Sequence, residues 1–286
     1  MAQRLVDVGE VELYFESFGD ATRPTVLLVS GAAASMDWWD VGLCRRLADG
    51  GRHVVRYDHR DTGRSATGTP GAPSYDAWQL GRDCVGLIEA LDVGPVHLVG
   101  ISMGGGIGQA IALRQPMLLA SLALLSTSAV GGVDWGTLPG PRAALTASFE
   151  SPAPDPDWAD VDSYADWVVA GQALFAGEIP LDEPAVRAVA SSVHARSIDP
   201  AAAANHWLVV GGEGRDDEPL DVHRIKTPTL VVHGSADPFF PLPHGRALAD
   251  AIPGATLLVA QGLGHQVPPP PTWDLVVPAL LQHTGD

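Results

Sequence analysis

The sequence has few basic residues. It carries 17 Lys and Arg residues against 34 Asp and Glu residues, so its formal net charge is −17 at pH 7. A protein that binds nucleic acid through phosphate contacts needs a basic face. The scattered cations of this chain form no block, so the composition excludes a nucleic-acid binder. Docking on an anionic membrane surface is disfavoured for the same reason.

Cysteines and long apolar runs are also scarce. The two cysteines, Cys44 and Cys84, lie among apolar residues in helix-like patterns, so we expect them in the core and not in a disulfide. The longest apolar runs, such as Thr25–Val29, fall far short of the roughly 20 residues that cross a bilayer. Residues 1–10 lack the apolar core of a signal peptide. These absences predict a cytoplasmic protein without a membrane span.

Apolar runs of strand length alternate with segments of helix length. This alternation predicts a mostly parallel, eight-stranded sheet with helices on both faces. Residues 11–15 are expected to form an edge hairpin with the residues before Gly9. The other strands are expected at 25–29, 53–57, 96–99, 122–125, 229–232 and 256–259, where the runs are nearly continuous, as in strands covered on both faces. Helices are expected at 38–48, 75–91, 102–115, 243–252 and 272–283.

The pattern changes between residues 131 and 221. This segment is rich in Ala, Pro and Asp, and it carries no strong strand signal. Amphipathic stretches lie around 162–175 and 184–193, which is typical of helices packed against a core. We therefore expect residues 131–221 to form a helical cap, inserted into a core domain made of residues 1–130 and 222–286.

Residues 96–106 are the most informative stretch, because they predict a strand, then Gly-Ile-Ser-Met-Gly, then a helix. So tight a turn lifts the central side chain above the sheet and requires small residues two positions to either side, here Gly100 and Gly104. Ser102 is therefore the predicted nucleophile. It lies at a helix N-terminus, where free backbone N–H groups favour developing negative charge, and the N–H of Met103 is a predicted oxyanion donor.

A nucleophilic serine needs a base, and the base needs an acid that orients it. In a sheet of this kind the serine is followed in the chain by Asp or Glu and then by His. Asp237 and His265 each follow a strand-like run and a glycine turn. We predict that His265 is the base and that Asp237 fixes its tautomer and stabilises its imidazolium. Asp134 is an alternative acid, and His244 is a weaker rival for the base.

The second oxyanion donor is expected in the loop after residues 25–29. Gly31 permits the turn, and the backbone N–H of Ala32 is the predicted donor. Gly31 and Ala33 are expected to border the substrate. Aromatic residues of the 131–221 segment offer apolar surface to a bulky substrate, and they are Trp135, Phe149, Trp158, Trp167, Phe175 and Trp207. Of these, we predict that Trp135, Trp167 and Trp207 bind substrate, with packing of the cap on the core as the alternative for each.

With these residues the chain resembles the α/β-hydrolase superfamily. Residues 57–65, Tyr-Asp-His-Arg-Asp-Thr-Gly-Arg-Ser, look like the family's D-x-R-x-x-G-x-S segment, and this likeness implies that Asp58 and Arg60 tie together the loops beneath the site. Together with residues 11–13 and 18–20, the segment is similar to aclacinomycin methylesterases. That resemblance implies hydrolysis of a carboxylic ester, such as the methyl ester of an aromatic polyketide. The family usually carries His where this chain has Ser30.

The sequence therefore predicts a serine esterase with an acyl-enzyme intermediate. No metal or organic cofactor is implied, because Cys and His do not cluster at zinc spacings and the glycines after Ser102 are not a dinucleotide fingerprint. The expected partner is a small, neutral and largely apolar ester, since a negative field repels anions. A monomer or a homodimer is expected. The serine also argues against dehalogenases and epoxide hydrolases of this fold, which place Asp at the elbow.

Three alternatives stay open. The chain could be a cofactor-free haloperoxidase or perhydrolase, or an inactive binding module of the same fold. It could also be a C–C bond hydrolase, which would need basic groups in the cap to bind a dienoate carboxylate. The few basic residues of the cap are Arg142, Arg187, Arg196 and Arg215.

Overall fold

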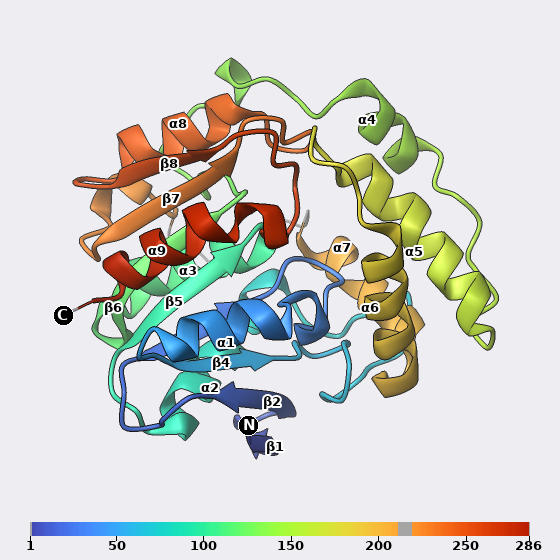
Figure 1. Ribbon diagram of the computed structural model, residues 1–286, viewed down its shortest axis with the longest axis horizontal. Helices are drawn as coiled ribbons and strands as arrows, with labels where there is room; N and C mark the ends of the chain where they lie inside the picture. The colour runs from blue at the N-terminus through green and yellow to red at the C-terminus, as the bar shows by residue number, and fades with distance from the viewer. Residues whose placement is uncertain (1, 211–218, 286) are drawn as a thin grey trace.

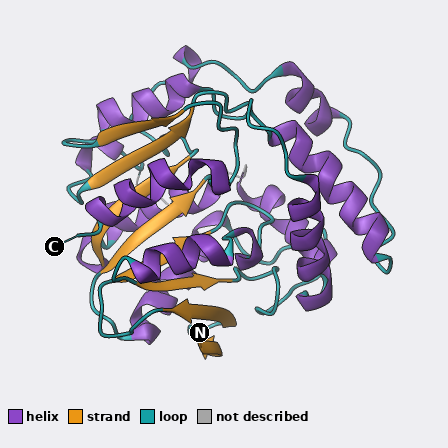
Figure 2. Cartoon of the chain, viewed as in Figure 1, coloured by secondary structure: helices purple, strands orange, loops and turns teal. Residues whose placement is uncertain are grey.

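The computed structural model describes residues 2–210 and 219–285, and within these ranges eight strands form one sheet in the order β1-β2-β4-β3-β5-β6-β7-β8 (Figures 1 and 2). The strands are β1 (Ala2–Asp7), β2 (Glu12–Phe18), β3 (Thr25–Val29), β4 (His53–Tyr57), β5 (Val96–Ile101), β6 (Leu119–Leu125), β7 (Thr229–Gly234) and β8 (Thr256–Ala260). Strand β2 is antiparallel to β1 and to β4, and the other neighbours are parallel. The predicted sheet and its N-terminal hairpin are confirmed.

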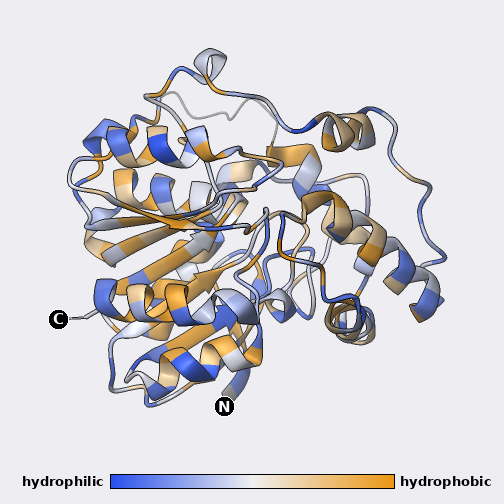
Figure 3. Cartoon of the chain, turned by 45° about the horizontal axis from the view of Figure 1, so that its top comes forward, coloured by the Kyte–Doolittle hydropathy of each residue, from blue (hydrophilic) through white to orange (hydrophobic). Residues whose placement is uncertain are grey.

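Five helices cover the sheet, namely α1 (Val41–Asp49), α2 (Ala77–Leu91), α3 (Met103–Arg114), α8 (Leu242–Ala251) and α9 (Trp273–His283). Successive side chains of a strand point to opposite faces, so Leu27 packs with α2, α3 and α8, whereas Leu28 packs with α1 and α9. Both cysteines are free and buried. Cys84 lies in the same apolar core as Leu27, and Cys44 lies in the core of Leu28 on the opposite face of the sheet. The central strands are largely hydrophobic, whereas the helices around them carry both hydrophobic and hydrophilic residues (Figure 3).

The first covering helix differs from the prediction. A helix was expected over 38–48, but the chain forms a short 3₁₀ turn at Met36–Trp38 and α1 begins only at Val41. The reason is Asp40, whose carboxylate accepts the N–H of Gly42 and caps α1. Such short polar side chains favour cap positions over helix interiors. Asp76 in the same way delays the start of α2 to Ala77.

Four helices lie together beyond the carboxyl ends of the parallel strands (Figure 1). They are α4 (Ala143–Glu150), α5 (Val161–Phe175), α6 (Glu183–Arg196) and α7 (Asn205–Val210). Helices α5 and α6 correspond to the two expected amphipathic stretches. The sequence did not predict α4, which is alanine-rich without apolar periodicity, or α7, which has six residues. The described part of residues 131–221 contains no strand, as expected.

Helices α5 and α6 share a small apolar core of their own, formed by Tyr164, Ala165, Val168, Val186, Ala190 and Val193. This core is separate from the two cores that flank the sheet. None of the helices in the described ranges is long and apolar enough to span a membrane.

Candidate active site

Ser102 lies where β5 ends and α3 begins, in the tight turn that the sequence predicts. Its φ of 52° and ψ of −117° are values that a residue with a β-carbon rarely adopts. Two hydrogen bonds hold this conformation: Ser102 N donates to Leu125 O at 3.0 Å, and Thr127 Oγ1 donates to Ser102 O at 2.9 Å. Backbone strain of this kind concentrates at functional sites.

Close backbone approaches explain why glycines flank Ser102. A β-carbon on Gly100 would lie 2.3 Å from Gly104 O, and one on Gly104 would lie 2.3 Å from Val29 O. Both positions therefore exclude every larger residue, as the sequence pattern indicates. On the other side, a β-carbon on Gly31 would lie 3.4 Å from Ser102 Cβ. The loop after β3 thus borders Ser102 directly.

The structure brings Ser102, His265 and Asp237 together in one chain of hydrogen bonds. Nε2 of His265 lies 2.9 Å from Ser102 Oγ, and Nδ1 lies 2.9 Å from Asp237 Oδ2. Since the carboxylate can only accept, Nδ1 carries the proton and Nε2 is free to accept one from Ser102. The three residues come from the ends of β5, β8 and β7, although 163 positions separate Ser102 from His265.

Asp237 is held by several groups at once. Its Oδ1 accepts the backbone N–H groups of Phe239 and Phe240, each at 2.9 Å, and its side chain is fully buried. Burial alone would raise the pKa of Asp237. The charge and hydrogen bond of His265, together with His233 and the backbone donors, outweigh burial and hold the pKa of Asp237 below its ordinary value. Asp237 therefore stays ionised beside His265.

The imidazole of His265 lies among three aromatic rings and is 8% exposed. Its centroid is 5.0 Å from that of Phe239, 5.5 Å from Phe240 and 5.8 Å from Phe175. Phe175 ends α5, and its carbonyl oxygen accepts the His265 N–H at 2.8 Å. The α4–α7 segment thus contacts the loop of the predicted base directly.

The alternative acid Asp134 and the alternative base His244 form hydrogen bonds with other groups. Asp134 is exposed and accepts the N–H of Gly136 at 2.9 Å, as the cap of a 3₁₀ turn. His244 is buried between Ser128 Oγ at 2.8 Å and Pro139 O at 2.9 Å. These contacts give neither residue a role at Ser102.

The loop after β3 forms a tight turn next to Ser102. Ala34 N donates to Gly31 O at 3.3 Å, and Ala33 has a φ of 58°. The Ala33 N–H donates to Nδ1 of His206 at 3.0 Å. The amides of Ala33 and Ala34 are therefore used within the structure, which leaves the Ala32 amide as this loop's candidate donor toward Ser102. Met103 is the first residue of α3, a position whose N–H has no acceptor within the helix.

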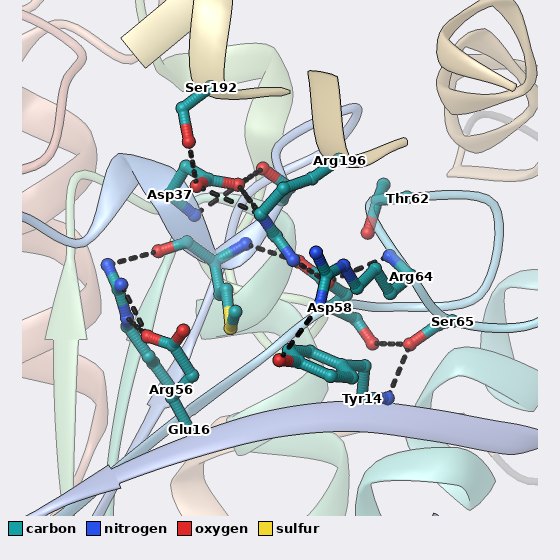
Figure 4. A network of polar contacts seen from close by, with 12 residues as sticks. Tyr14, Glu16, Asp37, Arg56, Asp58, Thr62, Arg64, Ser65, Ser192 and Arg196 are labelled. Carbon is teal, nitrogen blue, oxygen red and sulfur yellow. Dashed lines mark hydrogen bonds and ion pairs between the residues drawn. The ribbon is translucent and has the colours of Figure 1, made fainter. Parts of the chain in front are cut away.

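A buried ion-pair network joins α6 to the core (Figure 4). Nη2 of Arg196 lies 2.6 Å from Asp37 Oδ2 and 2.9 Å from Asp58 Oδ1, and Ser192 Oγ donates to Asp37 Oδ1 at 2.9 Å. Asp58 also accepts the N–H groups of Met36 and Arg64, each at 3.0 Å. The predicted structural role of Asp58 is confirmed.

Arg60, Arg187 and Arg196 each pair with carboxylates. Arg60 forms two hydrogen bonds to Asp83, at 2.6 and 2.7 Å, which confirms its predicted structural role. Of the cations that a C–C bond hydrolase would need, Arg196 is paired as described above, and Arg187 pairs with Asp166 and Glu183. Arg215 lies outside the described residues. No local pattern in the sequence predicts the carboxylate partners of Arg196, because they are distant in the chain.

The three predicted substrate-binding tryptophans lie in different surroundings. Trp207, 42% exposed, contacts Phe149 at 5.9 Å between centroids, and Phe149 in turn contacts Phe239. Trp135 packs against Phe240 at 5.8 Å. Trp167 instead contacts Tyr164, which belongs to the small core of α5 and α6, and Trp158, which packs against that core. Aromatic contacts thus connect Trp207 and Trp135, but not Trp167, with the rings around His265.

Comparison with known proteins agrees with this geometry. Residues 24–174, more than half of the chain, match the family model described as alpha/beta hydrolase fold, and residues 194–277 match the model of a TAP-like protein. The chain belongs to the alpha/beta hydrolase family. Among the described residues, no group of three or more His, Cys, Asp or Glu side chains could hold a metal ion.

Individual relatives point to hydrolysis of ester-type bonds. A rhodomycin D methylesterase from a Streptomyces species is 31% identical over 94% of this chain and 93% of its own length. A putative carbamate hydrolase from Pseudomonas syringae is 30% identical over 88% of this chain and 90% of its own length. The crystal structure of an esterase from a Rhodococcus species matches all of both chains with a TM-score of 0.77 at 20% identity, which shows the shared fold. The predicted family resemblance is confirmed.

Proposed function

We propose that the protein is a serine esterase that cleaves a carboxylic ester through an acyl-enzyme on Ser102. The observation that carries this proposal is the continuous hydrogen-bond chain from Asp237 through His265 to Ser102, at the turn between β5 and α3. A nucleophile within hydrogen-bond reach of a base, which is itself oriented by an acid, is the arrangement that acyl transfer requires. The methylesterase relatives support an ester as the substrate.

In this mechanism Ser102 Oγ attacks the ester carbonyl while Nε2 of His265 accepts its proton. Asp237, ionised and buried, stabilises the imidazolium that forms. The backbone N–H groups of Ala32 and Met103 bind the tetrahedral oxyanion. His265 then protonates the departing alkoxide. A water molecule, activated by the same imidazole, attacks the acyl-enzyme and releases the carboxylic acid and Ser102.

We further propose that residues 1–130 and 222–286 form the core domain and that residues 131–221 form a cap over the site. Two observations support this division. Helices α5 and α6 have an apolar core of their own. The same segment contributes Phe175 beside His265 and His206 beside Ala33. A cap in this position shields the reacting groups from water, which strengthens the electrostatic interactions inside the site.

The proposed substrate is small, neutral and largely apolar, such as the methyl ester of a bulky aromatic acid. Phe149, Phe175, Trp207 and Phe239 present aromatic surface connected with His265. Aromatic rings prefer offset or edge-to-face contacts with other rings, so they suit an aromatic substrate. The net charge of −17 disfavours anionic substrates and helps expel the carboxylate product.

The decisive experiment labels the nucleophile. A fluorophosphonate probe should add one mass increment to the peptide that contains Ser102, and the protein should hydrolyse p-nitrophenyl esters. The Ser102→Ala variant should be neither labelled nor active, with an unchanged far-UV spectrum as the folding control. An unlabelled, inactive wild-type protein would contradict the proposal and favour a binding module. Peroxide-dependent halogenation that exceeds ester hydrolysis would favour a perhydrolase.

A matched pair of variants tests the aromatic surface. Trp207→Ala should raise KM for a bulky aromatic methyl ester roughly tenfold, a loss of the size expected for one aromatic contact, while p-nitrophenyl acetate hydrolysis stays unchanged. Trp167→Ala is the control, because Trp167 is 39% exposed against 42% for Trp207 but packs on Trp158 and Tyr164. Steady-state kinetics on both esters measure the effect, and equal losses in the two variants would contradict this role of Trp207.

A further inference from the structure

Two buried histidines hold the loop that carries Ala32, one on each side. Nε2 of His59 lies 3.2 Å from Ser30 O, and Nδ1 of His206 lies 3.0 Å from Ala33 N. The two rings meet edge to face with centroids 5.7 Å apart, and the exposed fractions are 1% for His59 and 0% for His206. The backbone is therefore fixed immediately before and after the turn that contains the candidate donor.

The partners of His206 define its protonation state. The Ala33 amide can only donate, so Nδ1 of His206 must be unprotonated. Nε2 then carries the proton and donates to Arg60 O at 2.8 Å. Burial lowers the pKa of His206, and this effect outweighs the hydrogen bond to the Arg60 carbonyl and the charge of Asp61, which both raise it. The neutral ring is thus the form that fits these two contacts.

The position of His206 is fixed by the residue before it. The amide nitrogen of Asn205 donates to Asp61 Oδ2 at 2.9 Å and to Thr69 O at 3.1 Å, and its oxygen accepts the Gly71 N–H at 2.8 Å. Asn205 is fully buried. The beginning of α7 is therefore tied to the core by several hydrogen bonds. These bonds hold in place the backbone that carries His206.

We propose that His206 is a positioning residue for ester hydrolysis, which holds the Ala33 amide so that the neighbouring Ala32 N–H faces the oxyanion formed at Ser102. Ala33 has a φ of 58°, a region that an alanine leaves readily unless its neighbours hold it. The inference rests on the proposed esterase function. Because the oxyanion exists only after Ser102 has attacked, a misplaced donor lowers kcat and leaves KM nearly unchanged.

Two isosteric substitutions separate the contacts of His206. In His206→Asn the side-chain oxygen can take the place of Nδ1 and accept the Ala33 N–H. In His206→Gln the amide nitrogen reaches the place of Nε2 and keeps only the bond to Arg60 O. We expect His206→Gln to lower kcat on p-nitrophenyl acetate roughly 10- to 100-fold, somewhat less than the loss of an oxyanion donor itself, with KM unchanged. His206→Asn should stay close to the wild type.

A trifluoromethyl ketone inhibitor gives the second readout, because it forms a tetrahedral oxyanion on Ser102. Its affinity should fall in His206→Gln by the same factor as kcat and should be retained in His206→Asn. The inference would be overturned if His206→Gln kept the wild-type kcat and ketone affinity. It would also be overturned if His206→Gln and His206→Asn lost kcat and ketone affinity equally and both unfolded at lower midpoints. A wild-type protein that reacts with neither ester nor fluorophosphonate would overturn the proposed function, and this inference with it.

Discussion

At the scale of single residues, Asp237 offers a sharp test, because its contacts specify its charge and its orientation. We expect Asp237→Asn to lower kcat by about 10⁴-fold, since an amide no longer fixes the productive tautomer of His265. Asp134→Asn is the matched control. Asp134 was the alternative acid in the sequence, but it is exposed and only caps a turn, so this variant should hydrolyse p-nitrophenyl acetate at the wild-type rate. A similar loss in both variants would contradict the assignment.

The lowered pKa of Asp237 also predicts how stability depends on pH. A carboxyl whose pKa is lower in the folded state contributes stability that is complete above its unfolded pKa of about 3.9, and it loses this contribution as pH falls through the folded pKa. Urea unfolding of the wild type and of Asp237→Asn should therefore show the full difference in free energy at about pH 5, above the unfolded pKa of the carboxyl. The difference should shrink in more acidic buffer. A difference that grows toward acid pH would contradict the direction of the shift.

Single residues differ in how well the sequence predicts their contacts. The contact among Ser102, Asp237 and His265 was predictable because each residue follows a strand at a spacing that the fold requires, and their catalytic roles stay predictions. His206 was not predictable, because its partner Ala33 lies 173 positions away and no local pattern marks the contact. Arg196 and Asp37 are 159 positions apart and pose the same difficulty.

At the scale of elements, α3 is unusual because three consecutive glycines, Gly104 to Gly106, lie in its first turn. Glycine weakens a helix by about 0.5–1 kcal/mol relative to alanine. A glycine in a helix is therefore explained where a β-carbon would clash with a neighbouring group. The space for a β-carbon differs among the three residues. A β-carbon on Gly104 would lie 2.3 Å from Val29 O, whereas one on Gly106 would lie 3.5 Å from Val130 Cγ1, an ordinary contact.

We therefore expect opposite effects of the same substitution two residues apart. Gly106→Ala should raise the free energy of unfolding by about 0.5–1 kcal/mol and leave esterase activity unchanged. Gly104→Ala should lower it by about 1–3 kcal/mol, because the backbone of β3 must move, and should reduce activity as the turn at Ser102 shifts. Urea denaturation and p-nitrophenyl acetate kinetics measure both effects. Stabilisation by Gly104→Ala would contradict the steric argument.

Elements were predicted best where apolar periodicity is strong. The strands covered on both faces and the amphipathic helices α5 and α6 follow from the sequence because burial dictates their pattern. Helix α4 carries no comparable stripe, and α7 is too short to show one. The start of α1 was predicted too early, because apolar residues also precede Asp40. The helix begins only after Asp40, whose side chain caps it.

At the scale of the whole molecule, the attachment of the proposed cap depends on Arg196. Its side chain is 15% exposed, and those of its partners Asp37 and Asp58 are 9% and 0% exposed. Removal of one partner from a buried ion pair leaves uncompensated charge, at a cost of about 3–5 kcal/mol. We expect Arg196→Met to lower the free energy of unfolding by about this amount in guanidinium denaturation at neutral pH.

Arg187→Met is the matched control for Arg196→Met. Arg187 also contacts two carboxylates from α6 and α5, Glu183 and Asp166, but all three side chains are largely exposed to solvent. Exposed ion pairs contribute little to stability, so this variant should unfold at nearly the wild-type midpoint. Equal destabilisation by the two substitutions would mean that burial of the Arg196 network is unimportant.

The way in which α6 and α7 attach to the core has a consequence for protein engineering. Exchange of the proposed cap is a route to new substrate ranges. In this chain, however, Arg196, Asn205 and His206 all form hydrogen bonds to the core. A graft in place of the proposed cap that lacks them would leave Asp58 and Asp61 without these partners and the Ala33 amide without its acceptor. A productive chimera should therefore keep α6 and the residues up to His206 from the parent and exchange only α4 and α5.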